Sequence, residues 1–425
     1  MIGAGLSGLV CARRIAAGGA RVRVLEARER VGGRLCNGDL GGAVVDLGGQ
    51  WLTAGQSRLA ALATELGVAT YEHARVGQPV IDESGGMIVK IAAAFAQQRA
   101  IKRIEALMQR VPIGEPALAP DAALLDRVTL AAYLDENVKT QIARERIRLH
   151  ADLVFAADPA DISLLSYLAI MRATGGFRPG GADLPGGGRE HRFEGGAQRL
   201  AIQLAAGVDI AFGQPVIAIE QHGAHVTVRT EGGAHETKRV VLAIAPGLVK
   251  RIAIELPEPM QHYVDGVRMG SVVKAFAAYP RAFWRDRGLS GEVYRPNGAV
   301  RAVVEMMGEP PALLAFIVGP YAARWHERTP EDRRGEVLAT LEGYFGSDAA
   351  APIAYLEQDW GQDPWSAGCV ASTVIHVLAH GARWREPHGR IHVAGTESAI
   401  QWPGYMDGAI EAGERAGNEV LAALG

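Results

Sequence analysis

The chain has 425 residues, of which 48% are hydrophobic and 21% are charged, with a formal net charge of −3 at pH 7. This length suffices for two domains with separate cores, and the composition is that of a globular protein. Lys and Arg are spread along the chain, which excludes a concentrated nucleic-acid-binding patch. No apolar run is long enough to span a membrane. Because Cys11, Cys36 and Cys369 cannot form a disulfide framework, we expect a protein of the reducing cytoplasm.

Residues 1–34 predict a dinucleotide-binding site. Gly3, Gly5 and Gly8 have the G-x-G-x-x-G spacing, which allows a tight turn, close approach of the backbone to a pyrophosphate, and close packing of helix on strand. The N–H groups at the start of the following helix would bind phosphate oxygens. Residues 21–25 then alternate as in a strand, and Glu26 at its end can accept hydrogen bonds from ribose hydroxyls. An ordinary glycine-rich turn is the alternative.

The strand that should precede Gly3 is almost absent, because only Met1 and Ile2 come before it. That strand is normally central in a doubly wound sheet, so its loss would leave a gap in the core. We therefore expect the natural protein to begin several residues upstream of Met1.

Periodicity predicts the remaining elements. A strand-like segment, 43–45, precedes a second glycine turn at Asp46–Trp51. Helices are expected at 57–66, 91–111, 124–153, 198–205 and 405–424, and strands within 208–241, at 240–245 and at 390–395. The glycine- and proline-rich stretch 175–188 is expected to form a loop over a site.

One expected helix, 91–111, is amphipathic. Ile104 and Met108 lie on its apolar face, whereas Arg99, Lys102 and Arg103 make the other face basic. A solvated face is the simpler interpretation, and a membrane-surface role is the alternative.

Four segments together resemble the flavin-containing amine oxidases, the monoamine oxidase group. They are Gly3–Gly8, Glu26–Arg34, Asp46–Trp51, and a C-terminal block that joins Gly395–Glu397 to Trp402–Ala409. The similarity recurs over nearly the whole chain and is weakest at 76–120.

The resemblance implies an α/β fold in which a Rossmann-like FAD-binding domain is interleaved with a mixed α+β substrate-binding domain. The FAD-binding domain would comprise 1–75, 193–262 and 363–425. The substrate-binding domain would comprise 76–192 and 263–362.

The resemblance also implies how FAD is held. The pyrophosphate would bind near Ser7, the adenosine ribose at Glu26, the adenine at the backbone of Val216, and the isoalloxazine along Gln50 and Trp51. The residues expected to contact the cofactor are Gly3, Gly5, Ser7, Gly8, Glu26, Ala27, Arg28, Gly33, Arg34, Gly48, Gly49, Gln50, Trp51, Val216, Cys369, Gly395, Thr396, Glu397, Trp402 and Met406.

Lys274 and Tyr405 are the expected catalytic residues. Lys274 interrupts an apolar stretch, 270–276, that otherwise predicts a buried strand, where a lysine is costly unless it is paired or hydrated. The resemblance implies that it holds a water against flavin N5; a lysine at a sheet rim is the alternative. Tyr405 would form one wall of an aromatic cage for the amine. The position of the family's second tyrosine is Val370, so the pocket should favour a bulkier or aliphatic amine unless Trp365 or Trp402 supplies the other wall.

The three cysteines differ in their expected roles. Cys369 falls where monoamine oxidases attach FAD through a thioether, and covalent attachment stays open because many relatives lack that bond. Cys11 and Cys36 are expected to be packing residues. His376 and His380 are spaced i, i+4, but no third ligand accompanies them, so we expect no metal site.

The expected function is FAD-dependent oxidation of an amine to an imine by hydride transfer to flavin N5. The imine would hydrolyse to an aldehyde or ketone, and O₂ or a carrier protein would reoxidise the flavin. The alternatives are L-amino-acid oxidation or C–C desaturation on the same scaffold, an NAD-dependent dehydrogenase, and a non-catalytic FAD-bound subunit. A homodimer is an open alternative to a monomer.

Overall fold

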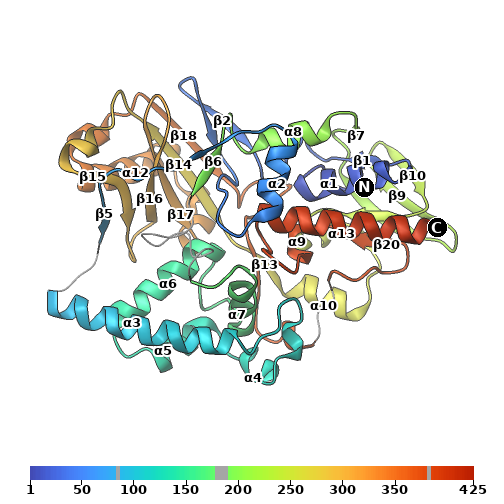
Figure 1. Cartoon of the computed structure of the whole chain (residues 1–425), viewed down its shortest axis with the longest axis horizontal. Helices are drawn as coiled ribbons and strands as arrows, with labels where there is room; N and C mark the ends of the chain where they lie inside the picture. Colours follow the sequence, from blue (N-terminus) through green and yellow to red (C-terminus); the bar gives the residue numbers. More distant parts are fainter. Residues whose placement is uncertain (83–86, 178–189, 381–383) are drawn as a thin grey trace.

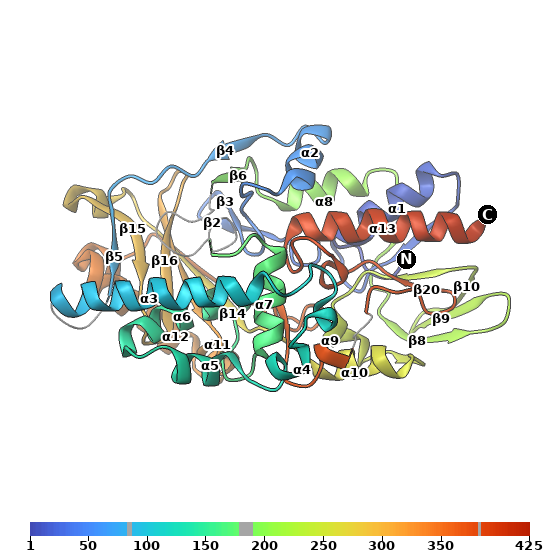
Figure 2. The ribbon, with the colours of Figure 1, turned by 60° about the horizontal axis from the view of Figure 1, so that its bottom comes forward.

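The computed structural model describes residues 1–82, 87–177, 190–380 and 384–425. The expected loop at 175–188 lies mostly outside these residues. The chain is of the α/β class, as expected, and its two termini lie at the same end of the molecule (Figures 1 and 2).

A parallel sheet forms the end of the molecule where the two termini lie. Its strands lie in the order β7 (Asp209–Ala211), β1 (Arg23–Leu25), residues 1–3, β11 (Val240–Leu242) and β20 (Ile391–Val393). Ile2 bridges to both Leu25 and Leu242, and its N–H donates to the Val241 carbonyl at 2.9 Å. The first residues of this chain therefore occupy the central position of the sheet.

Helices cover this sheet and pack tightly on one another. They are α1 (Leu6–Ala17), α2 (Ser57–Glu65), α8 (Gln198–Ala205) and α13 (Met406–Leu424). Helices α1 and α13 lie side by side in both ribbon views (Figures 1 and 2). Gly413 and Gly417 permit this approach, because a Cβ on Gly413 would lie 2.5 Å from the Ser7 carbonyl oxygen.

A six-stranded sheet forms the other end of the molecule. Its order is β18 (Ala354–Asp359), β14 (Val272–Ala278), β17 (Ala312–Val318), β16 (Val300–Met306), β15 (Leu289–Tyr294) and β5 (Gln78–Ile81), antiparallel except for the β15–β5 pair. Strand β14 is buried along its whole length. Val273 and Ala275 pack with helix α12 (Pro330–Phe345), whereas Phe276 packs with the hairpin β2 (Asn37–Leu40)–β3 (Ala43–Asp46). Burial on both faces explains the nearly continuous apolar sequence of this strand.

A helical layer lies beside this sheet (Figure 2). It comprises α3 (Met87–Met108), α4 (Ala122–Leu125), α5 (Leu130–Asn137), α6 (Gln141–Phe155) and α7 (Leu164–Ala173). The prediction of a single helix at 124–153 is wrong, because three helices occupy these residues. Thr129 starts α5 by accepting a hydrogen bond from the Ala132 N–H at 3.2 Å and bridges to Ser163, and Thr140 precedes α6. The cap at Thr129 and its bridge to Ser163 therefore interrupt the helix that the apolar periodicity predicts.

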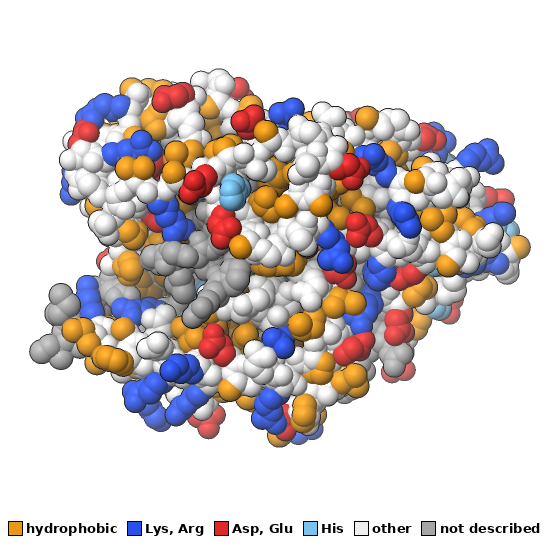
Figure 3. Space-filling view, in the orientation of Figure 1, with side chains coloured by type: hydrophobic (Ala, Val, Ile, Leu, Met, Phe, Trp, Pro, Cys, Tyr) orange, Lys and Arg blue, Asp and Glu red, His pale blue; other side chains and the backbone are white. Residues whose placement is uncertain are grey.

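Helix α3 has the two faces that its sequence predicts. Ile104 and Met108 are buried in the helical core, and Arg99, Lys102 and Arg103 are exposed. Lysine and arginine side chains gather at the lower left of the face in Figure 3, where α3 and α5 lie in Figure 1. Within the described residues, each helix is too short or too polar to cross a membrane.

The remaining strands form three smaller sheets. The strands are β4 (Thr70–Glu72), β6 (His191–Phe193), β8 (Val216–Gln221), β9 (Val226–Thr230), β10 (Gly233–Thr237), β12 (Ala253–Ile254), β13 (Val267–Met269) and β19 (Ala371–Thr373). The largest of these sheets has the order β10–β9–β8–β12, and the other two are the pairs β4–β6 and β13–β19. The short α-helices are α9 (Pro246–Val249), α10 (Glu258–Gly266) and α11 (Pro320–Ala323). The 3₁₀ helices are η1 (Pro116–Leu118), η2 (Phe283–Arg287), η3 (Trp325–Glu327), η4 (Ser347–Ala350), η5 (Leu378–His380) and η6 (Thr396–Ser398).

Candidate active site

A cavity of about 370 Å³ lies where distant parts of the chain meet. Its walls come from the N-terminal segment 2–56, from α6, β14 and β17, from residues 214–216 and 243–252, and from the C-terminal segment 360–409. All the site residues expected from the sequence line it except Gly8, Glu397 and Trp402. The structure thus brings together residues separated by several hundred positions.

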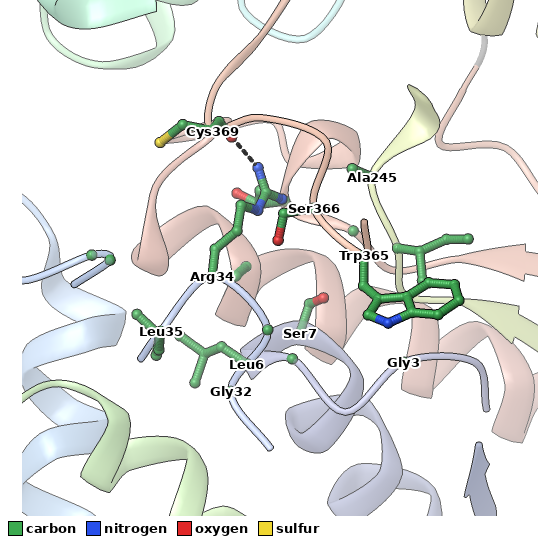
Figure 4. A pocket seen from close by; sticks show the side chains of 18 of the residues that line it. Gly3, Leu6, Ser7, Gly32, Arg34, Leu35, Ala245, Trp365, Ser366 and Cys369 are labelled. Atoms are coloured by element: carbon green, nitrogen blue, oxygen red, sulfur yellow. Dashed lines mark hydrogen bonds between the residues drawn. The ribbon is translucent and has the colours of Figure 1, made fainter. Parts of the chain in front are cut away.

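The glycine loop and the N-terminus of α1 form one wall, which is shown in Figure 4. No side chain caps α1, and its first turn holds no acidic residue. Gly5 and Gly33 face each other with bare backbone, since a Cβ on Gly33 would lie 3.3 Å from the Gly5 Cα. Gly8 stays outside the cavity because it packs on the loop, where a Cβ would lie 2.1 Å from the Gly3 carbonyl oxygen. An uncapped helix start beside bare backbone suits a pyrophosphate.

Glu26 lies at the other side of this loop and is buried. Its Oε2 accepts a hydrogen bond from the Ala4 N–H at 2.6 Å, and its Oε1 accepts one from the Arg28 N–H at 2.9 Å. The carboxylate keeps further lone pairs for ribose hydroxyls. Val216 lines the same region of the cavity, together with Gln214 and Pro215.

Two arginines join the N-terminal and C-terminal walls. Arg28 donates to Asp363 Oδ1 at 2.5 Å and to Ser366 Oγ at 2.8 Å. Arg34 donates to the Cys369 carbonyl at 2.5 Å, and its Nη1 lies 2.7 Å from Glu397 Oε1 (Figure 4).

The ion pair with Glu397 keeps Arg34 positively charged. Burial by itself would lower the pKa of Arg34, but the charge and hydrogen bond of Glu397 outweigh that effect, so the pKa is raised. Glu397 therefore acts behind the wall of the cavity, through Arg34.

Lys274 is buried, with only 4% of its surface exposed. Its ammonium donates to the carbonyl oxygens of Asp46 and Gly48, both at 2.8 Å, and to Gln50 Oε1 at 3.0 Å. These three acceptors match the three N–H donors of an ammonium group. Lys274 thus fixes the glycine turn that forms the wall next to Trp51, and the alternative of a lysine at a sheet rim is wrong.

The side-chain amide of Gln50 has a hydrogen-bond donor that is left for a ligand. Its Nε2 is buried and has no hydrogen-bond partner among the residues that the structure describes, and Gln50 lines the cavity. A flavin edge carries carbonyl oxygens and ring nitrogens that could accept this hydrogen bond. The residues present therefore fit a flavin, with the helix N-terminus free for a phosphate and this donor free for the ring edge.

Tyr405 and Val370 both line the cavity. Gly404, the residue before Tyr405, lies against Val370, because a Cβ on Gly404 would lie 3.3 Å from Val370 Cγ1. Trp402 lies outside the cavity and packs edge-on against Tyr405, with 5.3 Å between the ring centroids. Trp365 lies near Ala245 at the nucleotide end, away from Cys369, so it does not provide the second cage wall (Figure 4).

The cysteines fall into the two expected groups. Cys369 lines the cavity; burial raises the pKa of its thiol, although the charges of Arg34 and Lys274 partly oppose this. Cys11 of α1 is fully buried, and Cys36 is partly buried against two hydrophobic clusters.

Several lining residues were missed by sequence reasoning. Leu153 of α6 and Phe316 of β17 complete the apolar end near Lys274, and Phe316 pairs with Lys274 across the β14–β17 register. Arg251 lines the nucleotide end. Apolar residues carry no motif, so only strand register could have identified Phe316.

No group of three or more His, Cys, Asp or Glu side chains suited to a metal ion occurs in the part of the chain that the structure describes. The backbone at His376 has a positive φ of 65°, and its N–H donates to the Asp126 carbonyl. His376 and His380 therefore do not share one face of an α-helix.

Comparison with known proteins agrees with this geometry. Residues 6–421 match the model of the flavin containing amine oxidoreductase family. The flavin-containing amine oxidase of Danio rerio is 31% identical over 450 residues, which cover 100% of this chain and 86% of the relative. Among solved structures, putrescine oxidase bound to putrescine superposes with a TM-score of 0.91 at 30% identity, covering 99% of this chain and 98% of the other. Cyclohexylamine oxidase from Brevibacterium oxydans IH-35A superposes with a TM-score of 0.91 at 27% identity, covering 100% and 98%.

The fold and the cavity define a flavin-dependent oxidoreductase. The chain belongs to the flavin-containing amine oxidoreductase family, and its donor substrates are amines.

Proposed function

We propose that this chain uses FAD to oxidise an amine to an imine, which then hydrolyses to an aldehyde or ketone. FAD, when bound, would accept a hydride equivalent at N5 from the carbon next to the amine nitrogen and would pass the electrons to O₂, giving H₂O₂. The observation that carries the proposal is the single cavity lined by the glycine loop, by Lys274 and by Tyr405.

The protein's own residues would bind and orient the reactants. The glycine loop and the N-terminus of α1 would hold the pyrophosphate, and Glu26 the ribose. The N-terminus of α13, with Met406 at its first turn, lines the cavity and would stabilise negative charge that appears on the cofactor.

The end of the cavity next to Lys274 would bind the amine. Leu153, Phe316 and Val370 line it, and such apolar side chains favour an uncharged amine over an ammonium ion. Tyr405 would orient the nitrogen. Val370 in place of an aromatic wall leaves room for a bulkier or aliphatic amine.

Amine oxidation is favoured over amino-acid oxidation by the positions of the arginines. An amino-acid substrate requires a cation for its carboxylate. Among the described lining residues, the arginines Arg28, Arg34 and Arg251 bond to Asp363, to Cys369 and to the carbonyl of Pro364. Each of these arginines thus already donates to an acceptor of the protein itself.

An amine panel tests the proposal. The FAD-loaded protein should be bleached anaerobically by at least one aliphatic or bulky monoamine, and air should then produce one H₂O₂ for each amine consumed. A yellow protein that no amine bleaches would support the non-catalytic alternative instead, and bleaching by amino acids alone would support an amino-acid oxidase.

Covalent attachment of FAD to Cys369 is a separate proposal. Its sulfur belongs to a residue that lines the cavity. Acid precipitation of the holoenzyme should leave flavin fluorescence on the polypeptide, and Cys369→Ala should release it. Complete release of FAD from the unaltered chain would show that the cofactor is held without the bond.

A further inference from the structure

Residues 361–368, which we term the strap, cross the nucleotide end of the cavity. They lie between β18 and β19, and all of them are described by the structure and lie outside its helices and strands. Trp365 and Ser366 line the cavity, and Trp365 lies beside Ala245 (Figure 4). Trp365 is also 37% exposed. The strap therefore has the cavity on one side and solvent on the other.

The strap has hydrogen bonds of its own and is anchored at both ends. Within it, Asp363 Oδ1 accepts a hydrogen bond from the Trp365 N–H at 2.9 Å. Just before the strap, the Trp360 N–H donates to the first residue of β14 at 3.0 Å. Just after it, the Cys369 N–H donates at 2.9 Å to the carbonyl of Gly270, two residues before β14 begins. A compact loop with two neighbouring anchors can swing as one piece.

Two arginines from other parts of the chain hold the strap in place. Arg28, which follows β1, donates through Nη2 to Asp363 Oδ1 at 2.5 Å and to Ser366 Oγ at 2.8 Å. Arg251, which follows α9, donates to the Pro364 carbonyl. Hydrogen bonds in which both partners are charged are among the strongest in proteins. The contact between Arg28 and Asp363 is therefore the main latch between the strap and the glycine-loop side of the cavity.

We propose that the strap closes over the nucleotide part of FAD, with Trp365 covering it, and must open for FAD to enter or leave. This proposal rests on FAD as the proposed cofactor. Asp363 does not line the cavity that the described residues enclose, so it acts on FAD through the latch, as a positioning residue. Both partners of the latch belong to the protein. Weakening it therefore favours the open strap with or without FAD, and speeds entry and exit by the same factor.

Asp363→Asn tests the latch, because it removes the charge and keeps an oxygen for the Trp365 N–H. All proteins compared carry Cys369→Ala, so that no thioether retains the flavin. Exchange of bound FAD for an excess of radiolabelled FAD gives the release rate, and ultrafiltration of free FAD gives Kd; the association rate follows from the two. We expect release and association each to become about tenfold faster, since the latch loses one of its charges, and Kd to stay within about twofold.

Glu357→Gln is the matched control. The side chain of Glu357 is 15% exposed and pairs with Arg333 at 3.3 Å, whereas that of Asp363 is 16% exposed and pairs with Arg28. Glu357 belongs to β18 and does not line the cavity of the described residues, so its variant should leave both rates unchanged. Ser366→Ala, which removes the other side-chain acceptor of Arg28 in the strap, serves if Asp363→Asn does not fold.

Two results would overturn the role of the strap. One is an exchange rate that Asp363→Asn leaves as it is in the control. The other is faster release with unchanged or slower association, since a residue that only shapes the site weakens affinity without speeding entry. The measurement requires no turnover, so failure of the strap leaves amine oxidation standing, whereas an unaltered chain that takes up no FAD would overturn both proposals.

Discussion

At the residue scale, the lysine in β14 shows how a costly burial is compensated. Lys274 keeps its charge inside the protein by donating to three oxygens of one short turn. The same contacts hold the backbone of Asp46 and Gly48 at the cavity wall. To hold the proposed water near the flavin, Lys274 must redirect one of its three N–H donors from its present acceptor to that water.

Lys274→Met is therefore expected to have two effects. Reoxidation of reduced flavin by O₂ should slow by on the order of tenfold or more, because a fixed charge near the reacting centre is lost. The free energy of unfolding should fall by about 2–3 kcal/mol, since three acceptors lose a charged donor. Stopped-flow absorbance and urea unfolding measure the two effects. Unchanged reoxidation with lowered stability would reduce Lys274 to a positioning residue of the turn.

Asp152 of α6 provides a pH-dependent contribution to stability. Burial raises its pKa from 3.8 to about 6, although Arg301 opposes this. The folded state therefore binds the proton more tightly than the unfolded state, so the contribution of Asp152 to stability is fully present below pH 4 and is lost as pH rises through about 6. The difference corresponds to about 3 kcal/mol. Asp152→Asn combined with Arg301→Met should flatten this part of the stability curve in urea unfolding from pH 4 to 7, and parallel curves for both proteins would contradict the assignment.

At the element scale, the glycine loop and α1 depend on contacts that no larger residue can replace. A Cβ on Gly8 would lie 2.1 Å from the Gly3 carbonyl oxygen, so backbone would have to move. By contrast, Gly335 of α12 has open space around its Cβ position.

Gly8→Ala should therefore lose FAD binding and unfold at a lower temperature, whereas Gly335→Ala should stabilise the protein by about 0.4–1 kcal/mol. Flavin absorbance after gel filtration and thermal unfolding measure the two outcomes. Retention of FAD by Gly8→Ala would show that the loop can shift without loss of the site.

Periodicity and capping disagree within the helical layer, and capping decides. The apolar spacing of 124–153 suits one long helix, yet the side chain of Thr129 caps a new helix, and a further helix begins after Thr140 without a side-chain cap. The bridge between Thr129 and Ser163 is a contact between distant positions, which periodicity does not report.

At the scale of the whole molecule, the cavity joins parts of the chain that are far apart in sequence. Arg28 contacts Asp363, and Lys274 contacts Asp46. A ligand that fills this space contacts all of these parts at once and stabilises only the folded state. The boundaries of the two interleaved domains, and the cytoplasmic location, stay predictions.

Removal of the cofactor should consequently destabilise the molecule. The apoprotein is expected to unfold at a lower temperature, and FAD at 100 times its dissociation constant should restore about 2.7 kcal/mol. NAD should cause no comparable shift. Differential scanning fluorimetry of the apoprotein with each nucleotide measures this, and an equal shift with NAD would contradict a flavin-specific site.

The sequence by itself determined the α/β class, the glycine loop, Glu26, the C-terminal block and the family resemblance. These features reside in local spacing, because a tight turn and a helix start need particular residues at particular positions. It also marked Lys274, since a lone charge in an apolar strand must have a partner.

Only the tertiary structure decided what those partners are. The acceptors of Lys274, the apolar wall at Phe316, the place of Glu397 behind Arg34 and the latch of the strap all arise from contacts between distant segments. Such contacts depend on sheet register and on how helices pack, and a one-dimensional pattern does not encode them in any short motif.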